Sequence, residues 1–448
     1  EHLKQTPIDL DQPPEKAGII IPWTQVADRP NEDRADESAG LVEALGCELV
    51  FLRTEQVRKP TPGYLLSGGL LERLENDVKA FGCSMIIIDA ALSPIQQRNL
   101  ENRLGVKVID RTGLILEIFG LRARTKEGTL QVELARLLYE RSRLVRTWTH
   151  LERQRGGNGF LGGPGETQLE ADKRMIDRAV GRLRRDLADV QRTRRVQRQG
   201  RKRRDALIIA LVGYTNAGKS TLFNRLTGAN VMAKDMPFAT LDTTIRKIEL
   251  PNLGEANLID TVGFISDLPT HLVDSFRATL EEALSADMLI HVRDRSSVTD
   301  EDQKQDVLKV LGQLSELTDT PLPPMIEVWN KIDMVDPSMR GGLDAEQERL
   351  VDTMVAVQVS SITGEGTEDL LLTIEAILDQ GRKRFRAKLS HRDGALRAWL
   401  HEHTQVEDEA FDETGDAELC VSLTKDEFGR LAARFPVAAA TQFEHMEG

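Results

Sequence analysis

A glycine-rich loop between an apolar segment and a helix-like segment constrains this 448-residue chain more than any other feature. The apolar segment ALIIALV leads into Gly213-Tyr-Thr-Asn-Ala-Gly218-Lys219-Ser220, and TLFNRL follows. This is the G-x-x-x-x-G-K-[ST] pattern in the strand–loop–helix context that a phosphate-binding loop requires. Glycines let backbone N–H groups wrap the phosphates, and the N-terminus of the helix adds its positive end. The pattern predicts that Lys219 reaches the β- and γ-phosphates and that the Ser220 hydroxyl is a ligand of Mg²⁺.

Two further motifs follow in the order that a GTPase requires. NLIDTVGF contains Asp260-Thr-Val-Gly263, in which the aspartate would hold Mg²⁺ through water and the Gly263 N–H would sense the γ-phosphate. MIEVWNKID then ends in Asn330-Lys-Ile-Asp333. The carboxylate of Asp333 can accept hydrogen bonds from the guanine N1–H and 2-amino group, and adenine offers neither pattern. The spacing therefore predicts GTP rather than ATP, with GDP as the product.

The remaining loops of the expected site are less strongly determined. VSSITGEG supplies the last loop on the base side, where Ser360, Ser361 and Ile362 could place a backbone amide on guanine O6. PFATLDTTIRK offers three candidates for the switch threonine, Thr240, Thr243 and Thr244. We choose Thr240, because its distance from Lys219 suits a short effector loop. The other two threonines are then interpreted as the start of the next strand.

These motifs define the expected site of a GTP hydrolase. Lys219, Thr240 and Gly263 are expected to act in catalysis, and Ser220, Thr240 and Asp260 (through water) to hold Mg²⁺. The residues expected to contact the nucleotide are Gly213, Tyr214, Thr215, Asn216, Ala217, Gly218, Lys219, Ser220, Thr221, Phe238, Ala239, Thr240, Leu241, Asp242, Asp260, Thr261, Val262, Gly263, Asn330, Lys331, Ile332, Asp333, Ser360, Ser361 and Ile362.

One residue departs from the Ras-like pattern. Ras-like enzymes place a water-orienting glutamine directly after the D-x-x-G glycine. Here that position is Phe264, whose side chain can orient no water. We therefore expect slow intrinsic hydrolysis, with a partner supplying or reordering the missing group.

The charge of the chain is distributed very unevenly. The formal net charge is −13, yet residues 172–204 contain fourteen Lys or Arg against four Asp. A basic segment on an acidic body is typical of a nucleic-acid contact. A solvated helix face laced with ion pairs is the alternative interpretation, but four acids cannot pair with fourteen bases. The imbalance favours a polyanionic partner.

Leucine-rich stripes flank a glycine-rich segment and predict an antiparallel helical hairpin. Steps of three and four, broken once at Arg141, connect Leu130, Leu134, Leu137, Leu144, Trp148 and Leu151, and unbroken steps connect Ile176, Val180, Leu183, Leu187 and Val190. Such stripes are typical of helices that pack along a seam. Thr167 and Glu170 have the spacing of a capping box at the start of the second helix. Each helix of about 24 residues would be roughly 36 Å long.

The rest of the chain predicts further domains. Strand-like and helix-like segments alternate before residue 124, which favours a small parallel α/β domain. We therefore expect a multidomain α/β chain: residues 1–124 as that domain, 125–204 as the basic hairpin with a tip at 155–166, 205–382 as the P-loop GTPase domain, and 383–448 as a small acidic α+β domain. No apolar segment is long enough to span a bilayer, although a peripheral membrane contact stays open. Three scattered cysteines suit a reducing cytoplasm, and we expect a monomer.

The order of these segments resembles an HflX-type GTPase, a ribosome-associated translational GTPase of bacteria. The resemblance is carried by GGNGFLGGPGETQLE, GYTNAGKST, FATLD and DTVGFI, and it covers nearly all of residues 15–380. GPGETQLE is far more specific than the phosphate loop. The resemblance implies binding to the large ribosomal subunit and its RNA, with the hairpin tip directed toward the peptidyl-transferase region. It also implies the splitting or remodelling of stalled or stressed ribosomes.

The glycine-rich tip is then interpreted as an RNA-contacting element. Small residues allow close approach to folded RNA, and Arg155, Asn158 and Phe160 could contact a phosphate, a base edge and a base face. A flexible turn is the alternative, but connections between antiparallel helices need only two to five residues.

Two residues depart from the family pattern, and we expect a functional consequence from only one of them. The first domain of the family often carries a Gly-x-Gly-Lys loop, proposed as a second nucleotide site. Here the segment is Ser67-Gly-Gly-Leu70, so we expect no ATP site there. Ser361 replaces the usual alanine, with little consequence expected.

Two functions remain open at this point. The first is a GTP-hydrolysing enzyme that remodels ribosomes. The second is a nucleotide-gated ribosome-assembly or RNA-binding scaffold whose slow hydrolysis resets it. Phe264 keeps the second one open.

Overall fold

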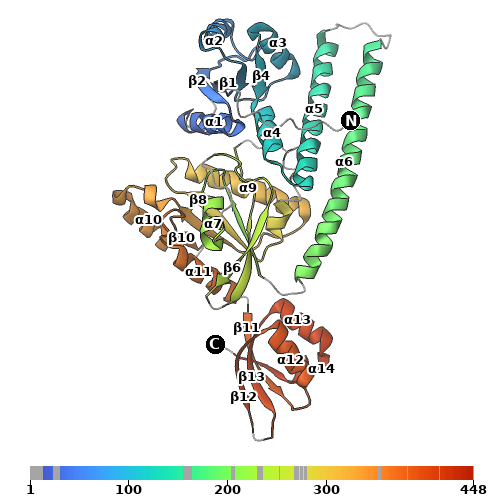
Figure 1. The fold of residues 1–448 in the computed structure, drawn as a ribbon, viewed down its shortest axis with the longest axis vertical. Helices are drawn as coiled ribbons and strands as arrows, with labels where there is room; N and C mark the ends of the chain where they lie inside the picture. Colours follow the sequence, from blue (N-terminus) through green and yellow to red (C-terminus); the bar gives the residue numbers. More distant parts are fainter. Residues whose placement is uncertain are drawn as a thin grey trace.

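The computed structural model describes residues 14–23, 31–154, 164–202, 207–229, 236–251, 253–266, 272, 276, 280–350, 355–380, 382–412 and 414–446. Figure 1 shows an N-terminal α/β region at the top, a central α/β region in the middle and a C-terminal region at the bottom, with two long helices beside the upper two regions. Within the described residues, no helix combines the length and the apolar composition that crossing a membrane would need.

The N-terminal region is a parallel sheet in the order β2-β1-β3-β4, as the alternating pattern predicts. Ser93 begins α3 with a capping box to Gln96, and Gly82 and Gly105 end α2 and α3 in the left-handed conformation. Its elements are β1 (Lys16–Trp23), α1 (Asn31–Leu45), β2 (Glu48–Gln56), α2 (Gly68–Phe81), β3 (Met85–Ile88), α3 (Pro94–Leu104), β4 (Lys107–Asp110) and α4 (Arg111–Arg122). In place of the lysine of a second phosphate loop, Leu70 lies buried in α2.

Two long helices form the hairpin that the leucine stripes predict. They are α5 (Lys126–Gln154) and α6 (Pro164–Lys202), which run side by side in opposite directions (Figure 1). The seam is confirmed over its middle part: Leu134, Val180, Leu183 and Leu187 are buried, with Leu130, Leu137 and Ile176 packed against them, whereas Leu144 and Val190 are partly exposed and lie outside this cluster. The side chains of Trp148 and Leu151 and the glycine-rich residues 155–163 lie outside the described residues.

The predicted length and start of these helices are wrong. With 29 and 39 residues, α5 and α6 exceed the expected 24, and at 1.5 Å per residue they extend about 44 and 58 Å. The second helix begins at Pro164, so Thr167 lies inside it and cannot be its N-cap. Proline has a fixed backbone angle and lacks an N–H, so the first turn of a helix accepts it readily. The capping-box spacing of Thr167 and Glu170 is therefore coincidental.

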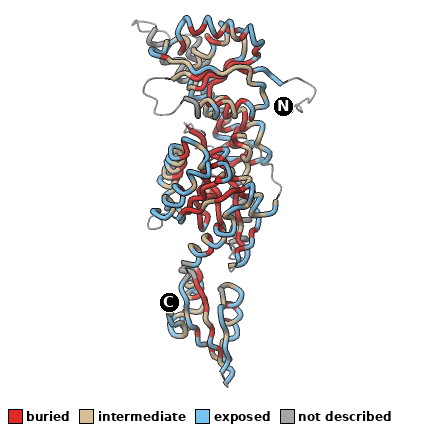
Figure 2. The backbone as a smooth tube through the Cα atoms, turned by 90° about the vertical axis from the view of Figure 1, so that its left-hand side faces the viewer, coloured by how far each residue is buried: buried red, intermediate tan, exposed pale blue. Residues whose placement is uncertain are grey.

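The central region is a six-stranded sheet in the order β10-β9-β8-β5-β7-β6, parallel except for the β6–β7 pair. Figure 2 shows buried backbone concentrated along this sheet. Its elements are β5 (Leu207–Gly213), α7 (Lys219–Thr227), β6 (Thr244–Leu250), β7 (Gly254–Asp260), β8 (Met288–Asp294), α9 (Asp300–Thr318), β9 (Met325–Asn330), the 3₁₀ helix η1 (Ile332–Met334), α10 (Pro337–Leu350), β10 (Ala356–Gln358) and α11 (Thr367–Gln380).

The C-terminal region is an antiparallel sheet in the order β12-β13-β11-β14 with helices packed beside it. Its apolar side chains form a separate core around Trp399, Leu400 and Leu419. Its elements are β11 (Arg382–Leu389), α12 (Gly394–His403), β12 (Gln405–Phe411), β13 (Ala417–Thr424), α13 (Lys425–Arg434), α14 (Pro436–Thr441) and β14 (Phe443–His445).

Helix α4 connects the N-terminal region to the central region. Its residues Ile115 and Phe119 belong to one hydrophobic core together with Phe238 and Phe276 of the central region. Phe119 meets the rings of Phe238 and Phe276 edge-on, at centroid distances of 4.6 and 4.8 Å. Because a buried aromatic side chain contributes both apolar area and a preferred geometry, these contacts fix α4 against the central region.

Truncating Leu183 to alanine should loosen the hairpin seam. Removing a buried leucine costs about 2–5 kcal/mol, because a cavity remains where the side chain was. The Met175→Ala variant on the same helix is the control: Met175 is 60% exposed, so its truncation should change stability by less than about 0.5 kcal/mol. Denaturant unfolding followed by far-ultraviolet circular dichroism compares the two. Equal midpoints for both variants would contradict the packing of α6 on α5.

Candidate functional site

The phosphate loop between β5 and α7 requires glycine at two places. Gly213 and Gly218 both have positive φ angles, 149° and 93°. A Cβ atom on Gly213 would lie 2.3 Å from the carbonyl oxygen of Val292, and one on Gly218 would lie 2.2 Å from Nδ2 of Asn330. The loop therefore packs directly on the β8 backbone and on the guanine-side loop, and any side chain would push them apart.

Lys219 is the first residue of α7 and lies buried below the loop. Its Nζ donates hydrogen bonds to the carbonyl oxygens of Gly213 (3.0 Å) and Tyr214 (2.6 Å). Burial lowers the pKa of Lys219 to about 8, partly offset by the nearby carboxylate of Asp260. An anion beside this ammonium would favour its charged form, so the site is prepared for phosphate.

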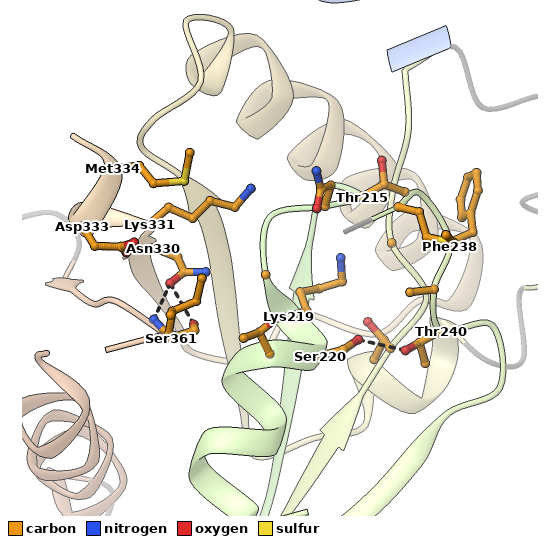
Figure 3. Close-up of a pocket in the computed structure, with 18 residues that line it drawn as sticks. Thr215, Lys219, Ser220, Phe238, Thr240, Asn330, Lys331, Asp333, Met334 and Ser361 are labelled. Carbon is orange, nitrogen blue, oxygen red and sulfur yellow. Dashed lines mark hydrogen bonds between the residues drawn. The ribbon is translucent and has the colours of Figure 1, made fainter. Parts of the chain in front are cut away.

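Three oxygen-bearing side chains converge beside Lys219, those of Ser220, Thr240 and Asp260, of which Figure 3 draws the first two. Ser220 Oγ lies 2.8 Å from Thr240 Oγ1 and donates to Asp260 Oδ2 at 2.7 Å, and Thr240 Oγ1 donates to the same oxygen at 3.0 Å. Of the three candidate threonines, the structure thus brings Thr240 to this cluster. Thr243 instead donates to Glu282, and Thr244 begins β6.

The cluster fits the magnesium ion that the motifs imply. Hydroxyl and carboxylate oxygens are the ligands that Mg²⁺ prefers. The second carboxylate oxygen of Asp260, Oδ1, is buried and has no hydrogen-bond partner among the described residues. Burial also raises the pKa of Asp260, against the opposing effects of Ser220, Lys219 and Thr240. A buried carboxylate with an unsatisfied oxygen is favourably placed to receive a cation.

The D-x-x-G segment closes against the phosphate loop. The Phe264 N–H donates to Gly213 O at 3.1 Å, and the Thr215 N–H donates to Phe264 O at 2.7 Å. A Cβ atom on Gly263 would lie 3.1 Å from Lys219 Nζ, so this glycine is adjacent to the expected phosphate position. The Phe264 side chain belongs to the hydrophobic core and is only 2% exposed, so it is unavailable to the nucleotide.

The guanine-side loops are joined by one side-chain amide. Asn330 Nδ2 donates to Ala217 O at 2.8 Å, and Asn330 Oδ1 accepts from the backbone N–H (3.0 Å) and the hydroxyl (2.8 Å) of Ser361. The serine therefore adds a hydrogen bond that the usual alanine could not make. Lys331 has a left-handed φ of 61° and pairs with Asp294 at 2.8 Å. Asp333 is exposed at the end of the pocket, where a base could reach it (Figure 3).

A cavity of about 330 Å³ connects these groups. Its lining includes most of the predicted contact residues, from Thr215 to Ile362. The structure places nine predicted residues outside the lining: Gly213, Tyr214, Ala217, Leu241, Asp242, Asp260, Val262, Ile332 and Ser360. It adds Met236 and Met334, which the motifs did not include; Met334 follows Asp333 directly, and with the exposed Ile362 it could flank a base.

A buried cluster of polar groups connects the phosphate loop to the N-terminal region. The Tyr214 hydroxyl donates to Glu37 Oε2 at 2.8 Å and accepts from the Ser266 N–H at 2.8 Å. Arg111 pairs with Glu37 and with Asp89, and it donates to the carbonyl oxygen of Ser266 at 3.3 Å. Burial and the charge of Glu37 raise the pKa of Tyr214, so this hydroxyl keeps its proton.

The affinity for GTP should decline above about pH 8. Lys219 is protonated in the free protein well below its pKa of about 8 and loses its proton as the pH rises through that value. Above this pH, the binding of GTP must be accompanied by protonation of Lys219, so the affinity for GTP should fall by up to about tenfold per pH unit. Titration with a fluorescent GTP analogue from pH 6.5 to 9 would measure the decline. The arginine of Lys219→Arg stays charged, so any affinity that this variant retains should not change between pH 6.5 and 9. An affinity independent of pH in the unaltered protein would contradict the lowered pKa of Lys219.

Replacing Asp333 with asparagine should shift base preference. The variant loses hydrogen bonds from guanine to a charged acceptor, worth roughly 1.5–3 kcal/mol each. Xanthine presents a 2-oxo acceptor to which the new amide can donate, so XTP should compete better than GTP. Competition between the two nucleotides measures the change, and Asp336→Asn, on a neighbouring exposed carboxylate, is the control. Equal GTP affinity in Asp333→Asn and the parent would refute the assignment of Asp333.

The chain resembles characterised families along almost its whole length. Four family models match in succession: GTP-binding GTPase N-terminal (residues 32–120), GTP-binding GTPase middle region (122–201), 50S ribosome-binding GTPase (208–331) and HflX C-terminal domain (345–445). GTPase HflX of Magnetococcus marinus is 47% identical over 83% of this chain and 84% of its own length. GTPase HflX of Escherichia coli is 41% identical over 93% of this chain and 95% of its own length.

A solved structure is also similar. The GTP-binding protein from the archaeon Sulfolobus solfataricus, crystallised with GDP, is 25% identical, with coverage of 82% of this chain and 99% of that one and a TM-score of 0.44. The identity of the curated relatives and the four successive family models establish the assignment. The chain belongs to the HflX family of GTPases.

Proposed function

We propose that this GTPase binds the large ribosomal subunit through its RNA and uses GTP binding and hydrolysis to split or remodel stalled ribosomes. The observation that carries the proposal is the basic face of α6. Arg178, Arg182 and Arg185 are exposed along it and line a shallow groove with Met175 and Gly181. Among the described residues, no carboxylate pairs with these three arginines, so their charge is available to a polyanion. The family model over residues 208–331 carries the description 50S ribosome-binding GTPase, which supports the same partner.

Each residue of the nucleotide site has a separate proposed role in GTP binding and hydrolysis. Lys219 would pair with the β- and γ-phosphates, and the Gly263 N–H would donate to the γ-phosphate. Ser220, Thr240 and Asp260 would hold Mg²⁺, which when bound offsets the negative charge that develops on the phosphates. Asp333 and the Ser361 loop would select guanine.

The burial of Phe264 supports a need for an activating partner. A water molecule must be oriented for attack on the γ-phosphate, and in Ras-like enzymes a glutamine does this. The buried Phe264 cannot, and its backbone is bonded to the phosphate loop. We propose that ribosomal contact supplies or reorders the missing group, so that turnover accelerates on the ribosome.

A ribosome-assembly or RNA-binding scaffold remains the second candidate. The same basic helix and slow hydrolysis would serve a protein that only binds and is reset by GTP. The two functions differ in one observable, because a scaffold binds without separating the subunits. For both we propose a monomer in the cytoplasm, a setting supported by the free thiols of Cys47, Cys83 and Cys420.

Shortening the hairpin tip should separate binding from splitting. Replacing residues 157–163 with a Gly-Ser pair leaves a connection of a length that antiparallel helices use. The basic helix and the nucleotide site are unchanged, so ribosome association should persist. Subunit separation, followed by light scattering with GTP and with a non-hydrolysable analogue, should fail. Separation at the parental rate would make the tip a mere connector.

A second variant, matched to the tip deletion, removes the positive charge of the basic face of α6 and leaves the tip unchanged. Changing Arg178, Arg182 and Arg185 to glutamine should weaken ribosome binding and flatten its salt dependence, by up to about 0.9 in log–log slope per lost phosphate contact on a duplex. An unchanged slope would exclude this face of α6 from the interface. Parental binding without subunit separation in the unaltered protein would favour the scaffold.

A further inference from the structure

The loop that carries Thr240 lies against the junction between α4 and α5. We call residues 236–242 the switch I segment. At its start, Arg122 Nη2 lies 2.8 Å from the sulfur of Met236. Next, the Phe238 ring packs edge-on against Phe119, 4.6 Å between centroids. The segment is therefore in contact with the last residues of α4, before the hairpin begins.

The end of the switch I segment is bonded to the root of the hairpin. Asp242 was expected to contact nucleotide, but it lies outside the cavity lining. Its carboxylate accepts from the backbone N–H groups of Arg124 (2.9 Å) and Thr125 (2.9 Å) and from the Thr125 hydroxyl (2.5 Å). Thr125 Oγ1 also accepts from the Gly128 N–H in the first turn of α5, at 3.0 Å. Asp242 thus places a negative charge at the positive end of α5, which favours the contact further.

Thr240 lies between these two attachments. Phe238 and Asp242 are each two residues away from it, so neither can move far without moving Thr240. Phe238 has a left-handed φ of 55°, an unfavourable conformation for a bulky side chain. The Phe119 contact belongs to the packing that keeps it there. Between them, Thr240 Oγ1 is within 3.0 Å of both Ser220 and Asp260, the position from which it would hold Mg²⁺.

We propose that the α4–α5 junction positions the switch I segment for GTP, with Phe119 and Thr125 as positioning residues that act through Phe238 and Asp242. The switch segments of GTPases are ordered by contacts with the γ-phosphate and Mg²⁺, so a junction that holds Thr240 at the expected Mg²⁺ position would favour GTP over GDP. Because coupling between sites is reciprocal, GTP also stabilises the root of the hairpin. This inference goes beyond the ribosomal function, since it concerns the isolated protein.

Nucleotide discrimination tests the proposal. Asp242→Ala should weaken binding of a non-hydrolysable GTP analogue with Mg²⁺ on the order of tenfold, a typical coupling between sites, and leave GDP affinity unchanged. Asp242→Asn keeps an acceptor oxygen, and Thr125→Ala removes only the hydroxyl, so both should lose less. Glu255→Ala is the control, because Glu255 is an exposed carboxylate paired with Lys247 inside the central region. Retained GDP binding shows that each variant is folded.

Hydrogen exchange tests the reverse direction of the coupling. Backbone amides of residues 124–130 should exchange more slowly with the GTP analogue than with GDP in the parental protein, and Asp242→Ala should abolish the difference. Equal exchange in the two nucleotide states would overturn the proposal. So would an equal loss of GDP and GTP affinity in Asp242→Ala, which would make Asp242 a direct nucleotide contact or a purely structural residue. Neither assay contains ribosomes, so the outcome is independent of the ribosomal proposal.

Discussion

A single side-chain amide determines how the nucleotide site is assembled. Asn330 reaches from the end of β9 to the carbonyl of Ala217 in the phosphate loop and to the backbone and hydroxyl of Ser361 in the guanine-side loop. It can do so only because Gly218 has no Cβ atom, which would lie 2.2 Å from the amide nitrogen. The phosphate end and the base end of the cavity therefore have a fixed separation. The glycine of one motif and the asparagine of another, more than a hundred residues apart, form one structural unit.

The N-terminal region packs against two loops of this site from outside the sheet that carries them. Glu37 and Arg111 bind Tyr214 and Ser266, which lie beside the first glycine of the phosphate loop and just beyond the D-x-x-G motif. Charged groups that are buried this deeply are tolerated because they are paired with one another and with Asp89. Removing one partner would leave an uncompensated charge, so the two regions depend on each other for stability.

Local features of the fold and the meeting of Ser220, Thr240 and Asp260 could be predicted from the sequence, whereas contacts between the regions could not. The phosphate loop, the parallel sheets and the hairpin seam follow from spacing and periodicity, which are properties of short segments. The partners of Asp242 could not be predicted, because Thr125 lies 117 residues away and belongs to another fold unit. The burial of the Phe264 side chain could not be predicted either, because the motif shows only that phenylalanine replaces the expected glutamine. The prediction of the start of α6 was wrong because two local signals compete. The capping pattern at Thr167 predicts a start there, but Pro164 is an equally local signal and is the actual first residue.

Helix α5 is several times longer than the usual distance between two packed helices, so the hairpin could act as a lever. Its two roots continue into different parts of the chain: α5 follows α4 of the N-terminal region, and α6 ends five residues before β5 of the central region. Packed helices lie 8–10 Å apart, so a roughly 44 Å arm on that base would multiply a relative axial shift of the roots about fivefold at its far end. A displacement of about 1 Å, the size of an ordinary helix shift, would then move the tip by about 5 Å. The molecule could therefore produce a large mechanical stroke without any large rearrangement at the nucleotide.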